Sequence, residues 1–222
     1  MAKIKAVLFD FDGTLMDTNQ LILDSWYHVF DTYGMDRLPK EKITPTFGRE
    51  LGASLKEFFP DHPEEETVRI YRSFQQQIFK DRVRLFDGMP ELLEALISRG
   101  LRLAVVTSRL WQTLHNNSYD FKEEPLFEVI VSGEGITIPK PSPQPCQIAL
   151  ERLGIGPDEA IMIGDSAHDT LCARNAGVRS VLVGWSLACP PAAAKGTDYE
   201  PDYVIEKASD LLTLLDQIER GE

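Results

Sequence analysis

Cysteine is scarce in this chain of 222 residues, and the few cysteines present form no recognisable pattern. Cys146, Cys172 and Cys189 are scattered and have the spacing of neither a metal site nor a disulfide framework. We therefore expect reduced thiols in a cytoplasmic protein.

Long apolar runs and an excess of positive charge are also absent. No apolar run approaches the roughly 20 residues that a membrane span needs. Residues 1–5 lead directly into the first apolar run, so we expect no signal peptide. Lysine and arginine number 23 against 35 acidic residues, which gives a formal charge of −12. This charge disfavours nucleic acid and anionic membranes as partners, and an anionic substrate then requires a local cation or a divalent metal.

What the chain does contain predicts an α/β fold. Hydrophobic residues make up 43% of it, enough for one α/β domain or for a core with a small appendage. Short apolar runs predict strands at residues 6–9, 102–107, 128–132, 160–164, 180–184 and 203–205. Helices are expected between them, the last over residues 208–218. This alternation implies a doubly wound parallel sheet.

Residues 16–84 differ from the rest, because their apolar periodicity is helical and no convincing strand interrupts it. Three apolar helix faces are expected, made of Ile22, Trp26, Val29, Phe30 and Tyr33, then of Leu51, Leu55, Phe58 and Phe59, and last of Tyr71, Phe74 and Ile78. Prolines and glycines punctuate these segments. We expect an all-helical insert.

The most informative stretch is Asp10-Phe11-Asp12-Gly13-Thr14-Leu15, which follows the first predicted strand. It places two carboxylates where a strand ends in a turn. One carboxylate can attack phosphorus, and a second can move the proton of the leaving group. Carboxylate and carbonyl oxygens are also the ligands that Mg²⁺ prefers. A lone Asp-x-Asp is more often a solvated strand end, so the interpretation depends on further segments.

Three other segments place chemical groups at or beyond a predicted strand end. Thr107-Ser108 can hold a phosphate oxygen, although such a pair is also a common helix cap. Lys140 stands between two prolines that fix its backbone, although an exposed loop lysine is the plainer reading. Asp165 and Asp169 flank the start of a helix, where acids are favoured by the helix dipole alone. In open α/β sheets, all of these ends face one ligand crevice.

Together these segments make the chain similar to the haloacid dehalogenase superfamily of phosphohydrolases. The match covers the whole chain, with the four motifs in family order and spacing: the stretch from Asp10 to Leu15, then Thr107, then Lys140-Pro141, then Gly164-Asp165-Ser166 with Asp169. Hydrolytic dehalogenases do not keep an acid two residues after the nucleophile. Asp12 therefore favours a phosphate substrate.

The resemblance implies a role for each motif residue. Asp10 would be the nucleophile and Asp12 the proton donor and acceptor, while Lys140 offsets charge between nucleophile and phosphate. Mg²⁺ would be held by Asp10, the backbone carbonyl of Asp12, and Asp165, with Asp169 as a ligand or a supporting residue. Thr107 and the first loop would hold the phosphoryl group, with Gly13, Thr14 and Ser108 among the substrate-binding residues.

The resemblance also implies an α-helical cap of the C1 type, inserted into a Rossmann-like core. The predicted core comprises residues 1–16 and 86–222, and the predicted cap residues 17–85. Hinges are expected at residues 16–18 and 85–88. The loop 44–49 is expected to reach the core, where Arg49 would grip the part of the substrate that is not transferred, unless it is a solvated arginine at a helix start. A functional role for His28 is a further, weaker hypothesis.

The substrate depends on the cap. The chain resembles both phosphoglycolate phosphatases and the bacterial inorganic pyrophosphatases of this fold. Pyrophosphate is narrowly favoured, on segments 17–22, 47–48, 184–186, 201–203 and 209–212. Other small phosphomonoesters remain open, and β-phosphoglucomutase is a third option without a sugar-binding signature in the cap.

Two other classes are weighed and disfavoured. A receiver domain would carry its phosphoacceptor on a middle strand, where this chain has Thr107-Ser108. A catalytically dead binding protein is disfavoured because no catalytic position is substituted. We expect a small phosphorylated substrate, no nucleic acid or membrane as a partner, and a monomer or homodimer.

Overall fold

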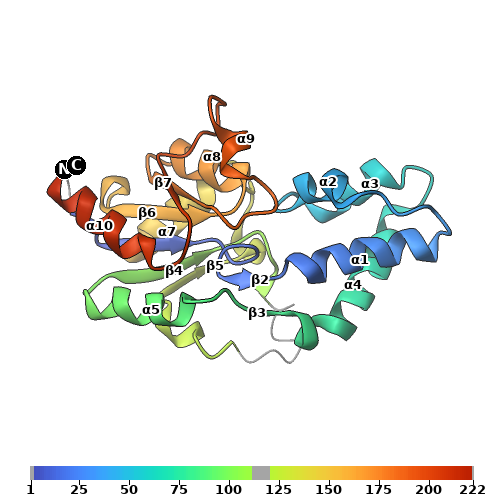
Figure 1. Cartoon of the computed structure of the whole chain (residues 1–222), viewed down its shortest axis with the longest axis horizontal. Coiled ribbons are helices and arrows are strands. Elements are labelled where there is room, and N and C mark those ends of the chain that lie inside the picture. Colours follow the sequence, from blue (N-terminus) through green and yellow to red (C-terminus); the bar gives the residue numbers. More distant parts are fainter. Residues whose placement is uncertain (1–2, 112–120, 222) are drawn as a thin grey trace.

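A six-stranded parallel sheet forms the centre of the computed structural model, which describes residues 3–111 and 121–221 (Figure 1). The strand order is β5 (Val129–Val131), β4 (Arg102–Val106), β1 (Ala6–Phe9), β6 (Ala160–Gly164), β7 (Arg179–Val183) and β8 (Tyr203–Ile205). Each predicted strand is present, with ends that differ by at most one residue. The α/β doubly wound prediction is therefore confirmed.

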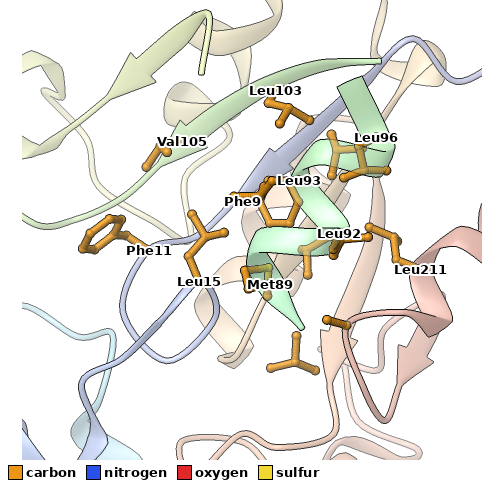
Figure 2. Close-up of a cluster of buried hydrophobic side chains, with 14 of the residues drawn as sticks. Phe9, Phe11, Leu15, Met89, Leu92, Leu93, Leu96, Leu103, Val105 and Leu211 are labelled. Atoms are coloured by element: carbon orange, nitrogen blue, oxygen red, sulfur yellow. The ribbon is translucent and has the colours of Figure 1, made fainter. Parts of the chain in front are cut away.

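A layer of helices covers each face of the sheet. Successive side chains of β1 point to opposite faces, so they pack against different layers. Val7 and Phe9 lie in one apolar cluster with helices α5 (Met89–Ser98) and α10 (Asp210–Arg220). Ala6 and Leu8 lie in a second cluster with α7 (Gln144–Leu153) and α8 (Ala167–Asn175). Figure 2 shows the first cluster, where Phe9 of β1 lies near Leu92 and Leu93 of α5. A buried strand with two apolar faces is typical of parallel sheets.

Four helices form a separate group beside the sheet (Figure 1). They are α1 (Asn19–Thr32), α2 (Lys40–Ile43), α3 (Leu51–Phe58) and α4 (Glu64–Arg82). Their own apolar cluster centres on Trp26, whose ring packs against the rings of Phe58, Phe59 and Tyr71. The helical periodicity predicted for this region is confirmed. Among the described helices, none is long and apolar enough to cross a bilayer.

The expectation of no strand between residues 16 and 84 is wrong. Strand β2 (Met16–Asp17) pairs in an antiparallel manner with β3 (Arg84–Leu85), so the two connections to the helical group form a short ribbon. Two-residue strands are too short to show an alternating pattern in the sequence. The ribbon includes parts of both predicted hinges.

The remaining elements are short: α9 (Pro191–Ala194) and 3₁₀ turns at Thr44–Thr46, Glu124–Leu126, Gly133–Gly135 and Pro157–Glu159. The last helix begins and ends two residues later than predicted. The division into core and cap remains a prediction, and residues 1, 2, 112–120 and 222 of the predicted core lie outside the described part of the chain.

Two residues of α5 that differ in burial allow a matched test of the core. Leu93 is fully buried, whereas Ile97 on the same helix is 41% exposed. We expect Leu93→Ala to lower the free energy of unfolding by about 2–5 kcal/mol, because it leaves a cavity. Ile97→Ala should change it by less than about 0.5 kcal/mol. Urea denaturation followed by circular dichroism measures both, and similar losses from the two variants would contradict this packing.

Candidate active site

The site lies at the carboxyl ends of three adjacent strands. Asp10 follows β1, Thr107 follows β4 and Asp165 follows β6. Backbone hydrogen bonds extend the sheet to these residues, since Asp10 N–H donates to Ile163 at 2.8 Å and Thr107 N–H to Val131 at 2.9 Å. The three side chains are buried. The main chain of the sheet therefore fixes where they lie.

Lys140 links two of the acids. Its Nζ donates to Asp10 Oδ1 at 2.7 Å and to Asp169 Oδ1 at 2.6 Å, and all three side chains are almost completely buried. Burial by itself lowers the pKa of Lys140, but Asp10 and Asp169 raise it well above its ordinary value. Lys140 is thus a permanent cation beside Asp10, as its place between two prolines predicted.

The acids outnumber this cation. Asp10, Asp165 and Asp169 each place a carboxylate oxygen within 4.8 Å of the others. Burial raises the pKa of Asp10 to about 7, with Lys140 acting against the rise and Asp169 adding to it. Burial also raises the pKa of Asp165 well above its ordinary value, with further contributions from Asp169 and Asp10. A cluster of buried, repelling carboxylate oxygens fits a hard divalent cation.

Asp169 is fully engaged within the protein. Its Oδ2 accepts hydrogen bonds from the N–H and hydroxyl of Ser166, at 3.1 and 2.6 Å, at the beginning of α8. Its Oδ1 accepts the bond from Lys140. A Cβ on Gly164 would lie 2.2 Å from the Cβ of Asp169, so only glycine leaves room for this arrangement. Asp169 therefore orients Lys140, in addition to any contact with a cation.

Gly13 and Thr14 are not among the residues that line the cavity next to these acids, and their role in substrate binding stays a prediction. The N–H of Gly13 is already used in the turn, where it donates to the Met16 carbonyl at 2.8 Å. A Cβ on Gly13 would lie 2.2 Å from Asp165 Oδ2. Gly13 thus makes room for Asp165. Thr14 is fully buried, and its hydroxyl has no hydrogen-bond partner among the described residues.

A cavity of about 570 Å³ joins this cluster to the helical group. On the sheet side it is lined by Asp10, Asp12, Thr107, Ser108, Lys140 and Asp169. On the helical side it is lined by residues that include Trp26, Phe47, Arg49 and Tyr71. The loop 44–49 therefore reaches the core, as predicted. Its closest approach is at Gly48, where a Cβ would lie 3.1 Å from Ser166 Oγ.

Two predicted residues of the helical group have ordinary surroundings. Arg49 lines the cavity, but its side chain is 36% exposed and forms an ion pair with the exposed Glu57 at 2.9 Å. His28 lies outside the cavity lining, and its ring stacks on Phe74 with centroids 4.1 Å apart. Nothing in this geometry supports the functional hypothesis for His28.

The sequence analysis missed Arg109, although it directly follows Thr107-Ser108. Its Nε and Nη2 donate to the two carboxylate oxygens of Asp12 at 2.8 and 2.6 Å. The Arg109 side chain is 9% exposed and lines the cavity. The only sequence signal is a basic residue directly after the hydroxyl pair, and 97 positions separate it from its partner.

Comparisons with known proteins agree with this geometry. Residues 7–183 match the family model described as haloacid dehalogenase-like hydrolase. The chain belongs to this family. It is 35% identical to pyrophosphatase PpaX of Bacillus velezensis, with 95% of each chain covered. It is 34% identical to pyrophosphatase PpaX of Bacillus cereus strain Q1, with 99% of this chain and 100% of that one covered.

Solved structures share the overall fold. A protein of Lactobacillus plantarum, provisionally assigned as a phosphoglycolate phosphatase, aligns with a TM-score of 0.81 and 26% identity over 96% of this chain and 100% of its own. A haloacid dehalogenase-like hydrolase of Streptococcus pneumoniae aligns with a TM-score of 0.80 and 26% identity over 96% and 99%. This haloacid dehalogenase-like chain is a phosphohydrolase that acts on small phosphorylated substrates.

The buried acids predict a measurable response to a divalent cation. Mg²⁺ at 100 times its dissociation constant should stabilise the native state by about 2.7 kcal/mol, a rise in Tm of roughly 5–11 °C for a chain of this size. We expect Asp165→Asn to lose most of this rise without lowering the Tm of the metal-free protein, because it removes a repelling charge. Differential scanning calorimetry measures both.

Asp61→Asn is the matched control, because Asp61 is exposed and far along the chain from the cluster. It should keep the full Mg²⁺ response. If Asp165→Asn responds to Mg²⁺ as the unsubstituted protein does, the cluster is not a cation site.

Proposed function

We propose that this chain is a Mg²⁺-dependent inorganic pyrophosphatase that works through an aspartyl-phosphate on Asp10. The observation that carries the chemistry is the buried Asp10 carboxylate, which faces the cavity with Lys140 at 2.7 Å. The relatives named pyrophosphatase, matched over nearly the full length of both chains, favour pyrophosphate as the substrate.

In the first step, an oxygen of Asp10 attacks phosphorus. The new P–O bond forms as the bridging P–O bond breaks, and Asp12 gives its proton to the leaving oxygen. In the second step, water attacks the same phosphorus, Asp12 takes a proton from it, and the bond to Asp10 breaks. Inorganic phosphate leaves, and both aspartates return to their initial states. Lys140 and the Thr107 hydroxyl contact the phosphoryl oxygens between these steps.

Asp10, Asp165 and the backbone carbonyl of Asp12 would hold the Mg²⁺ ion, and Asp169 would support the site through Lys140. When bound, the ion offsets negative charge on the phosphoryl oxygens and on the acid cluster. The donor set fits this ion, because it consists of buried carboxylate oxygens whose mutual repulsion is incompletely balanced by Lys140.

The helical group would act as the cap, with residues 17–85 moving over a core of residues 1–16 and 86–222. The β2–β3 ribbon holds both connections together, so closure is a rotation about one narrow joint. Closure would exclude bulk water from the cavity during the first step. A cytoplasmic location and a monomeric or homodimeric state remain predictions from the sequence.

Phosphoglycolate is the second candidate substrate. The solved structure from Lactobacillus plantarum carries that provisional assignment, and the cavity of about 570 Å³ has room for a leaving group with a carboxylate. In both cases the leaving group is a small anion. The two substrates differ only in the anionic group that the cavity must hold beyond the transferred phosphoryl group.

The test is phosphate release by the purified protein from pyrophosphate, phosphoglycolate and a panel of small phosphomonoesters, with and without Mg²⁺. Pyrophosphate should give the highest kcat/KM, and chelation with EDTA should abolish turnover. A higher value for any phosphomonoester would refute pyrophosphate as the preferred substrate.

Asp10→Asn tests the proposed nucleophile. The substitution nearly preserves the side-chain volume but removes the attacking oxygen charge, so we expect turnover to fall by at least about 1000-fold. The fold should survive, because Asn can still accept a hydrogen bond from Lys140. Steady-state phosphate release and circular dichroism measure the two effects. A variant that keeps a tenth of the activity would exclude Asp10 as the nucleophile.

A further inference from the structure

Contacts of both its backbone and its side chain fix the position of Arg109. Its backbone N–H donates to Thr107 Oγ1 at 3.0 Å, and its carbonyl accepts from Gly133 N–H at 2.9 Å. Its guanidinium lies over the ring of Phe79 in α4, 5.5 Å from the ring centroid. A Cβ on Gly133 would lie 2.9 Å from the Ser108 carbonyl, so this loop packs closely. The arginine is therefore fixed at the junction of sheet and helical group.

The guanidinium is a buried cation that needs an anionic partner. Its side chain is 9% exposed, whereas Arg49 across the cavity is 36% exposed. A buried charge without a partner costs several kcal/mol. Here that partner is Asp12, which uses both carboxylate oxygens in the pair. Any state in which Asp12 turns to the substrate therefore needs another anion for Arg109.

The leaving group can supply that anion. An arginine fork that binds a carboxylate through two parallel bonds also binds phosphate oxygens in the same way. Since Asp12 and Arg109 both line the cavity, a substrate bound there meets both ends of the pair. Arg49 has a weaker claim to this role, because its ion pair with Glu57 lies in solvent, where such pairs contribute little.

We propose that Arg109 is the specificity-determining residue of this enzyme. It exchanges the Asp12 carboxylate for the anionic part of the leaving group, a phosphate or a carboxylate, and so frees Asp12 to face the bridging oxygen. The exchange rests on the proposed function, since it assumes that Asp12 serves the leaving oxygen. On leaving Arg109, the Asp12 carboxylate takes up one proton from solvent, so it can donate that proton to the bridging oxygen and leaves no unpaired negative charge in the cavity wall.

The exchange makes the enzyme selective for the charge of the leaving group. A leaving group with a phosphate or carboxylate keeps the buried guanidinium paired throughout the reaction. A leaving group without one leaves Arg109 either unpaired or still bound to Asp12. Both alternatives raise the activation free energy above that for a substrate with an anionic leaving group.

The test compares kcat/KM of the full chain with Mg²⁺ for three substrates. Pyrophosphate and phosphoglycolate have anionic leaving groups, whereas p-nitrophenyl phosphate has neither a second phosphate nor a carboxylate. In Arg109→Gln we expect kcat/KM for the two anionic leaving groups to fall about 100-fold or more. The fall for p-nitrophenyl phosphate should be at least tenfold smaller.

Two companion measurements separate recognition from a structural role. Free guanidinium ion added to Arg109→Ala should restore part of the pyrophosphate activity and none of the p-nitrophenyl phosphate activity. Arg109→Lys keeps the charge without the planar fork. Its kcat/KM should again fall more for the two anionic leaving groups than for p-nitrophenyl phosphate, but by less than in Arg109→Gln. Arg69→Gln is the matched control, because Arg69 is an exposed arginine of the same helix as Phe79, and it should leave all three values unchanged.

Equal losses on all three substrates in Arg109→Gln, without rescue by guanidinium, would overturn the exchange. It would also be overturned if the unsubstituted enzyme showed no preference for anionic leaving groups. A preference for phosphoglycolate over both other substrates, lost in Arg109→Gln, would refute pyrophosphate as the substrate and still support the exchange.

Discussion

The balance of buried charge at the sheet edge is the constraint on which the rest of the site depends. Four carboxylates, Asp10, Asp12, Asp165 and Asp169, meet two cations, Lys140 and Arg109. With all of these groups ionised, two negative charges remain uncompensated in a low-dielectric region, which a divalent cation matches. The ion pairs also orient the side chains, because Lys140 binds Asp10 and Asp169, and Arg109 binds Asp12. The strand ends position the backbone of Asp10 and Asp165, and the charged contacts orient the side chains.

The helical group depends on the core in a different way. Its centre is an aromatic cluster around Trp26, separate from the two clusters that cover the sheet. Yet Leu21 and Phe79, from its first and last helices, pack into the core cluster with Phe11 and Leu15. The group is therefore anchored at the end next to the β2–β3 ribbon and packs on itself elsewhere. Any movement of the group relative to the core would therefore be smallest next to the ribbon.

Much of this molecule could be predicted from its sequence, because its strands are buried on both faces and each ends in a short polar motif. Lys140 and Asp169 follow from such local patterns. Arg109 does not, because 97 positions, the whole helical insert among them, separate it from its partner Asp12. The family resemblance predicts that Gly13 and Thr14 bind substrate, but it does not predict that Gly13 also makes room for Asp165 or that the Thr14 side chain is fully buried. Contacts between distant loops and the exact path of a turn are set by packing, which a local pattern does not encode.

Three glycines set how closely the groups around the acid cluster can pack. At Gly13, Gly164 and Gly48, the space of a missing Cβ is filled by Asp165, Asp169 and Ser166 respectively. Gly13 and Gly164 each admit a carboxylate so closely that a methyl group and the acid cannot coexist, so neither glycine can gain a side chain while its acid stays in place. Gln75 and Gln76 of α4 line the cavity and take no part in these close contacts, so we expect single substitutions there to change which leaving group fits while the acid cluster stays in place.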